Sequence, residues 1–267
     1  MEKGARKAEE EFGINLIVKT GAKETSIDQQ IAIVEEMIES GVDAIVIAPG
    51  SSTELIPVLK KAQDAGIKII NIDNKLDEKV SEAAGLKDVP FISVDNESSA
   101  YMSCKYIVDK AKGPVEAVLI EGIRGADNAE MRKKGALRAM KENTAVKVVA
   151  MESANWKIDE SYDVIEKIYE KHPKVKLIFC ANDMMALGVL QYLEKYGKDD
   201  VLVAGFDALE EAKEAISKGK LQTTVNQQAD VQGYTGVKYA VEMLKGTMPP
   251  LETMVEAKLI TQENAGE

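Results

Sequence analysis

The stretch LIFCAND at residues 177–183 is an apolar run that ends in two polar side chains, and a helical pattern follows it at once. The same order recurs at residues 69–74, 201–207 and 221–227. Strands that are apolar on both faces are typical of a parallel sheet whose two sides are covered by the intervening helices. The alternation therefore predicts an α/β fold with parallel sheets.

Two runs of this alternation, at residues 14–94 and 115–226, predict two Rossmann-like α/β domains. A (β/α)₈ barrel is the structural alternative, but it needs evenly spaced units, and the weak strand at 91–94 interrupts the rhythm. A long helix from residue 229 and a late strand at 255–260 remain after the second run. Returning the helix to the first domain makes the domains discontinuous, which is typical of a hinge that closes on a ligand.

The composition argues against a nucleic-acid partner and against a segment that spans a membrane. The 267 residues carry a formal net charge of −11, whereas nucleic-acid binding needs a basic surface that neutralises phosphates. No apolar stretch approaches the roughly 20 residues of a membrane span. The charged pattern directly after Met1 is not that of a signal peptide. We therefore expect no nucleic-acid partner, and we expect no export address in the sequence as given.

Residues suited to catalysis are scarce. His172, the only histidine, lies at the end of a predicted helix, where a cation is favourable. The sequence has no GxSxG, Walker or GxGxxG motif after a strand, and the loop at 122–125 lacks the third glycine and the lysine of a phosphate-binding loop. Cys104 and Cys180 have no metal-ligand spacing and are expected to be buried free thiols. The prediction is a protein that is no enzyme and uses neither metal nor cofactor.

Polar side chains stand at the ends of the predicted strands, which is where open parallel sheets bind their ligands. Asp73, Asn182, Asp207 and Gln227 each follow an apolar run. Asp and Asn also cap helix N-termini, so capping is the alternative role for single members of this set. Gln227 is a poor cap but a good partner for a hydroxyl group. The four together favour a site that grips a polar, neutral ligand.

Two further side chains suit a sugar. Trp156 is the only tryptophan and follows a predicted strand. A flat aromatic ring stacks on the apolar C–H face of a sugar, although packing on its own domain is an equal alternative. Arg132 lies one turn inside the helix after the loop at 122–127. Its rigid fork of donors suits adjacent oxygens, with a surface ion pair as the alternative.

Several short motifs are weak alone but specific in their order and spacing. They are VIAP at 46–49, NIDNK at 71–75, EG at 121–122 with RKKG at 132–135, ANDMMALG at 181–188, GFD at 205–207 and TVNQ at 224–227. Together they resemble the ribose-type periplasmic sugar-binding proteins, the solute receptors of ABC importers. The resemblance covers nearly the whole chain. Within that family, the Asp-x-Lys form at 73–75 and the pair Asn155-Trp156 are similar to allose-binding members.

The resemblance implies two Rossmann-like domains joined by a three-crossover hinge. One sugar-binding lobe would comprise residues 1–95 and 229–254, and the other would comprise 96–228 and 255–267. The implied function is a receptor that closes on an allose- or ribose-like pyranose and delivers it to the membrane permease of an ABC importer. The implied state is a monomer when full length, in the periplasm or outside the cell, with a lipid anchor as one option. The effector-binding domain of a sugar-responsive regulator is the alternative.

The resemblance also assigns roles at the sugar. Asp73 and Asn74 would bind it from the first domain, and Trp156 would stack on the ring. The remaining contacts would come from Arg132, Asn182, Asp207 and Gln227.

The family begins with a strand that lies between those predicted here at 14–18 and 44–48, and this sequence starts after it. The loss of this strand would leave unpaired backbone groups on both neighbouring strands, and the alternative is that another segment fills the slot.

Overall fold

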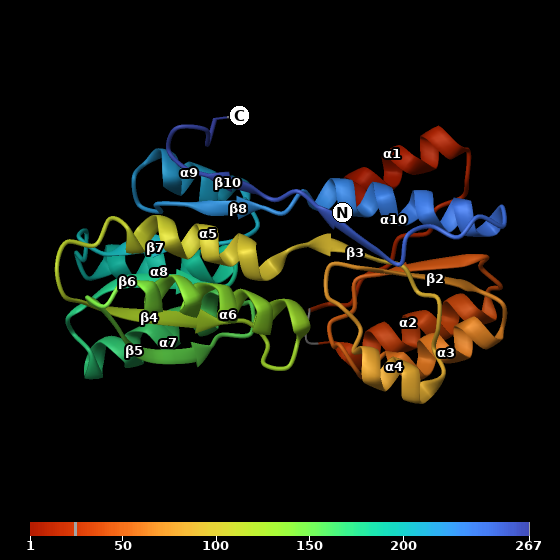
Figure 1. Ribbon diagram of the computed structural model, residues 1–267, viewed down its shortest axis with the longest axis horizontal. Helices are drawn as coiled ribbons and strands as arrows, with labels where there is room; N and C mark the ends of the chain where they lie inside the picture. The colour runs from red at the N-terminus through yellow and green to blue at the C-terminus, as the bar shows by residue number, and fades with distance from the viewer. Residues whose placement is uncertain (24–25, 267) are drawn as a thin grey trace. The chain divides into compact units, whose positions relative to one another are not determined.

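The computed structural model describes residues 1–23 and 26–266, and Figure 1 labels its helices and strands. The chain divides into two compact units, each built on a four-stranded parallel sheet. The first unit contains Met1–Val94, Gly125–Asn128 and Gln228–Glu256, and the second contains Asp95–Arg124, Ala129–Gln227 and the chain from Ala257 on. This architecture confirms the predicted fold class. Within the described ranges, no helix combines the length and apolarity needed to cross a bilayer.

The sheet of the first unit has the strand order β1-β2-β3-β9, with β1 at Ala44–Ile47, β2 at Lys68–Ile72, β3 at Phe91–Val94 and β9 at Glu252–Val255. The sequence of β2 explains its central place, because four of its five residues are buried and successive side chains point to opposite faces. Ile69 belongs to one apolar cluster, whereas Ile70 and Ile72 belong to another on the opposite face. Both faces therefore need a covering layer of helices.

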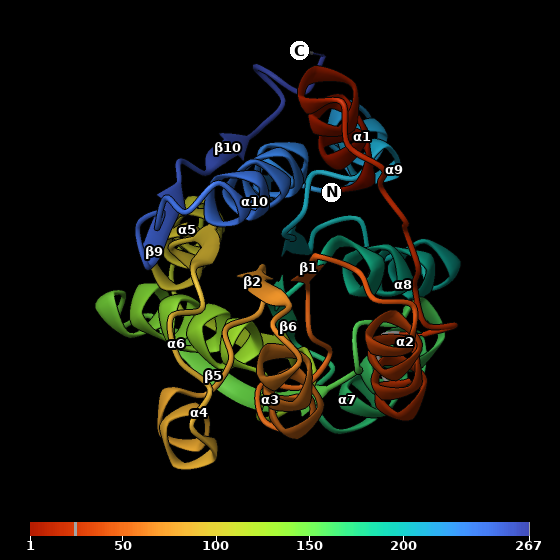
Figure 2. The ribbon, with the colours of Figure 1, turned by 90° about the vertical axis from the view of Figure 1, so that its right-hand side faces the viewer.

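Helices supply that layer on both faces (Figure 2). Those of the first unit are α1 (Glu2–Phe12), α2 (Ile27–Glu39), α3 (Ile56–Asp64), α4 (Glu78–Ala84) and α10 (Ala229–Leu244). The helices α2 and α3 pack in the cluster of Ile69, and α10 packs in the cluster of Ile70. Gly4 lets α1 lie close on α10, because a Cβ there would be 1.7 Å from the carbonyl oxygen of Asp230.

The predicted strand at 14–18 is wrong, because these residues form no strand. A strand needs a hydrogen-bonded neighbour, and within the described part of the chain β1 pairs with β2 alone. A cavity of about 480 Å³ lies beside β1 instead, lined by residues 14–17, by 44–46 and by apolar side chains of α10. Among the described residues, β1 therefore has no strand partner on its outer edge.

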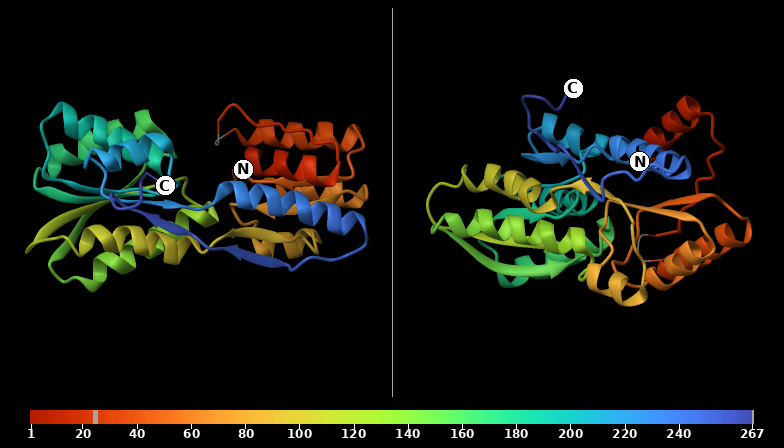
Figure 3. Two further views of the ribbon diagram at one scale, coloured as in Figure 1. Left: turned by 90° about the horizontal axis from the view of Figure 1, so that it is seen from above. Right: turned by 45° about the vertical axis from the view of Figure 1, so that its right-hand side comes forward.

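The second unit has the strand order β5-β4-β6-β7, with β4 at Val115–Glu121, β5 at Val146–Ser153, β6 at Val175–Cys180 and β7 at Leu202–Ala204. Its helices are α5 (Asn96–Val108), α6 (Asp127–Glu142), α7 (Ile158–Lys171), α8 (Asp183–Lys195) and α9 (Glu210–Ser217). The helices α5 and α6 lie on one side of the sheet, and α7 and α8 lie on the other (Figure 3). Because the four strands are parallel, their carboxyl ends meet at one edge of the sheet.

The late strand predicted at 255–260 is two strands. The first is β9, which adds to the sheet of the first unit, and the second is β10 at Lys258–Ile260. β10 pairs antiparallel with β8 at Thr224–Asn226 in the second unit. The break falls where the chain passes from one unit to the other, after Glu256.

The two thiols are expected to be unreactive in the folded protein. Cys104 and Cys180 are free and completely buried, and burial raises the pKa of both thiols. Because the thiolate is the reactive species, both should resist a thiol-specific reagent under native conditions and react only on unfolding. Counting modified thiols with and without denaturant checks this, and fast labelling of the native protein would contradict it.

Candidate ligand-binding site

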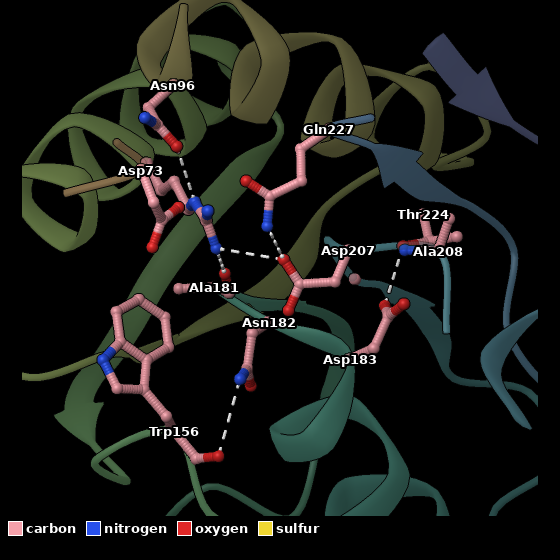
Figure 4. A network of polar contacts seen from close by, with 12 residues as sticks. Asp73, Asn96, Trp156, Ala181, Asn182, Asp183, Asp207, Ala208, Thr224 and Gln227 are labelled. Carbon is pink, nitrogen blue, oxygen red and sulfur yellow. Dashed lines mark hydrogen bonds and ion pairs between the residues drawn. The ribbon is translucent and has the colours of Figure 1, made fainter. Parts of the chain in front are cut away.

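Arg132 contacts a cluster of polar and aromatic side chains in the second unit. Figure 4 labels Asn96, Trp156, Asn182, Asp207 and Gln227 of this cluster. Arg132 lies on α6 and is only 3% exposed. Its Nε donates a hydrogen bond to Oδ1 of Asn96 at 2.8 Å, and its Nη1 donates to the carbonyl oxygen of Ala181 at 3.0 Å. The guanidinium carbon also lies 3.7 Å from the centre of the Phe206 ring. These contacts hold the fork of donors in one orientation.

Asp207 faces Arg132 from the turn after β7. Its Oδ1 lies 3.5 Å from Nη1 of Arg132 and accepts a hydrogen bond from Nε2 of Gln227 at 2.7 Å. The Asp207 side chain is 20% exposed, so the ion pair keeps access to solvent. The residue has a φ of 119°, and such a costly backbone conformation is often found at functional sites. A carboxylate, an amide and a guanidinium are thereby placed together, which gives both donors and acceptors for neighbouring hydroxyl groups.

Asn182 and Trp156 extend the cluster on a second side. Oδ1 of Asn182 accepts from the backbone N–H of Met185 at 2.9 Å, so this side chain does cap α8. Its Nδ2 faces the carbonyl oxygen of Trp156 at 3.5 Å. The centre of the Trp156 ring lies 5.6 Å from the guanidinium carbon of Arg132. The structure thus brings together Arg132, Trp156, Asn182, Asp207 and Gln227, which come from separate parts of the sequence.

Gly122 makes room for the indole of Trp156. A Cβ at Gly122 would lie 2.1 Å from two ring carbons of Trp156, far inside contact distance. Trp156 itself is partly buried and has a φ of 66°, next to Asn155 with a φ of 48°. The tight loop therefore lays the ring against the backbone after β4. Packing on its own domain and a stacking platform for a ligand are compatible roles for one ring that has two faces.

The other two predicted residues lie in the first unit. Asp73 directly follows β2 and has a φ of 66°, and its backbone carbonyl accepts from the hydroxyl of Ser93 at 2.8 Å. Asn74 is only 3% exposed. Its Nδ2 donates to the carbonyl oxygen of Pro49 at 2.9 Å, and its Oδ1 accepts from the hydroxyl of Ser52 at 3.2 Å. The amide is thus bonded inside the first unit, and a contact of Asn74 with the ligand stays a prediction.

No role at the ligand site was predicted for Asn96, Phe206 or Gly122, although Gly122 and Phe206 lie in the quoted motifs EG and GFD. Asn96 follows β3 and begins α5, and Phe206 directly precedes Asp207. Their positions at strand ends were a signal that could have found them. Their contacts with Arg132 and Trp156 join residues that are far apart in the sequence, and no local sequence pattern predicts such contacts.

The fold and this cluster define a two-domain α/β binding protein whose polar residues gather at the strand ends of a parallel sheet. The family model described as a periplasmic binding protein domain matches residues 1–248, and the chain belongs to this family. The resemblance found in the sequence is therefore confirmed.

Several similar proteins are described as binding a sugar. The D-ribose/D-allose-binding protein of Pseudomonas aeruginosa is 37% identical over 255 residues, which are 94% of this chain and 79% of the relative. The D-allose-binding periplasmic protein of Escherichia coli strain K12 is 32% identical over 264 residues, 97% of this chain and 85% of the relative. A similar solved structure is an ABC transporter periplasmic solute binding protein from Actinobacillus succinogenes 130z with bound D-allose. Its TM-score is 0.93 at 35% sequence identity, and the match covers 99% of this chain and 93% of the other chain.

Proposed function

We propose that this protein is a receptor that binds a monosaccharide without changing it and delivers it to the membrane permease of an ABC importer. The observation that carries the proposal is the Arg132–Asp207–Gln227 group next to the Trp156 ring. Charged donors and acceptors make strong hydrogen bonds to hydroxyl groups, and an aromatic ring stacks on the apolar face of a sugar. The relatives support the same function, because they are import and periplasmic binding proteins of sugars.

D-Allose is the proposed first ligand and D-ribose the second. Two relatives are described as allose-binding, one of them also binds D-ribose, and a similar structure holds D-allose. Asn182 supplies a polar edge beside Trp156, and Asp73 is the proposed contribution of the first unit. Hinge closure between two such lobes is a known way to enclose a small ligand.

Isothermal titration with a panel of sugars tests the proposal. D-Allose and D-ribose are expected to bind, with weaker or no binding of D-glucose and D-galactose. Because Trp156 is the only tryptophan, its fluorescence should change on binding and follow the same isotherm. A sugar recovered unchanged after binding would support a receptor, and a modified sugar would show an enzyme instead. The proposal would be wrong if no sugar of the panel gave a heat of binding or raised the unfolding temperature.

The cellular setting follows from the same proposal. We infer that the protein acts in the periplasm or outside the cell, since a relative is described as periplasmic. A monomeric state is proposed with it, on the family resemblance alone. A regulator of gene expression is not favoured, because the similar proteins are import binding proteins. Fractionation of cells that produce the protein from its own gene checks the location.

A further inference from the structure

Asp183 carries a carboxyl group buried directly behind the ligand cluster. The residue begins α8 and is completely inaccessible to solvent. Its Oδ1 accepts a hydrogen bond from the hydroxyl of Thr224 at 2.7 Å, and its Oδ2 accepts from the backbone N–H of Leu209 at 3.0 Å. Burial, and then the charge of Asp207, raise the pKa of Asp183. A protonated carboxyl still bonds Thr224, because a hydroxyl group both donates and accepts.

The hydrogen bonds of Asp183 and Thr224 reach the backbone of the turn that contains Asp207. Asp207 and the following Ala208 have φ values of 119° and 56°, which side-chain-bearing residues rarely adopt. The backbone N–H of Ala208 donates to the hydroxyl of Thr224 at 3.2 Å, and the backbone N–H of Asp183 donates to the carbonyl of Phe206 at 2.7 Å. An unusual backbone of this kind persists only where its surroundings hold it.

The close approach of the carboxyl group depends on Gly205. A Cβ at Gly205 would lie 2.2 Å from Oδ1 of Asp183, so any larger residue would push the carboxyl group away from the turn. The hydroxyl of Thr224 is equally enclosed, since the residue is completely buried. Asp183 and Thr224 thus bond residues on both sides of Asp207, whose own carboxylate points to Arg132 and Gln227.

We propose that Asp183 and Thr224 are positioning residues for the sugar site, which hold the 206–209 turn in its left-handed form and so aim the Asp207 carboxylate. The inference rests on the proposed function, because it concerns the affinity for a sugar. In the described structure, the hydroxyl of Thr224 forms hydrogen bonds with Asp183 and Ala208 and with no member of the cluster. Its effect on binding must therefore pass through the turn.

Thr224→Val tests this role, because valine keeps the shape and removes the hydroxyl. The expected result is a loss of affinity for D-allose of roughly tenfold or more. Thr223→Val is the matched control, since Thr223 is also completely buried but donates its hydroxyl to the carbonyl of Ile260 at 2.7 Å, away from the turn. Both variants should lose similar thermal stability, and only Thr224→Val should lose affinity. Thr224→Ser should keep the affinity of the wild type.

A double-mutant cycle separates positioning from general damage. If Thr224 acts through Asp207, then Thr224→Val should weaken binding little further in an Asp207→Asn background. Asp183→Ala is the second variant should Thr224→Val not fold, and it should weaken binding in the same way, because it removes both carboxyl oxygens that bond Thr224 and Leu209. Equal affinities of the wild type and Thr224→Val, or equal losses in Thr224→Val and Thr223→Val, would overturn the positioning role. A wild type that binds no sugar would instead overturn the proposed function, and the positioning role with it.

Discussion

Replacing Arg132 by methionine is expected to lower the affinity for D-allose by at least about 100-fold. Methionine retains an apolar stem over the Phe206 ring but removes every donor of the guanidinium. Asp207 then loses the cation at 3.5 Å, and the Oδ1 of Asn96 and the carbonyl of Ala181 lose their donors. Leaving such partners unsatisfied costs about 1–3 kcal/mol each where they are buried. Isothermal titration measures the affinity, and thermal unfolding measures the accompanying loss of stability.

Two companion variants define what the Arg132 result means. Arg132→Lys keeps the charge but lacks the planar fork, so its affinity should lie between those of the wild type and Arg132→Met. The single nitrogen of lysine cannot reproduce the positions of Nε and Nη1, which bond Asn96 and Ala181 separately. Arg138→Met removes a charge from the same helix, but Arg138 is exposed and pairs with Glu97 outside the cluster. Its affinity should equal that of the wild type. A loss in Arg138→Met as large as in Arg132→Met would show that the site geometry is not the cause.

The second-domain cluster was largely predictable because its members obey a local rule. Asn182, Asp207 and Gln227 each follow an apolar run, and parallel strands bring their carboxyl ends to one edge. The same rule also selected Asn74, whose amide is bonded inside the first unit. Position at a strand end thus predicts where a side chain lies, whereas its hydrogen-bond partners depend on how the surrounding unit packs.

What failed in the prediction depended on partners far along the chain. The residues at 14–18 have the apolar pattern of a strand, yet a pattern cannot supply the hydrogen-bonded neighbour that a strand needs. In the same way, nothing near Gly122 in the sequence reveals that the ring of Trp156 lies against it. Asn96 was overlooked because its contact with Arg132 spans 36 residues. Such non-local contacts are set by the packing of the whole unit.

Gly122→Ala is expected to displace the indole of Trp156 and to weaken sugar binding by roughly 10- to 100-fold. The added methyl carbon would lie 2.1 Å from two carbons of the ring, so either the ring or the backbone after β4 must move. Because Trp156 is the only tryptophan, its emission spectrum should differ from that of the wild type even before sugar is added. Fluorescence and isothermal titration thus report the cause and the consequence separately.

Two controls complete this experiment. Gly266→Ala adds the same methyl group where nothing lies within 4 Å, and it should change neither the emission nor the affinity. Trp156→Phe keeps a smaller ring, and with Gly122 unchanged it should lose less affinity than Gly122→Ala, because a phenyl ring still stacks on a sugar in the original place. If Gly122→Ala shifted the emission but kept full affinity, the ring would be a packing residue only. The sugar would then be bound only by hydrogen bonds between its hydroxyl groups and Arg132, Asp207 and Gln227.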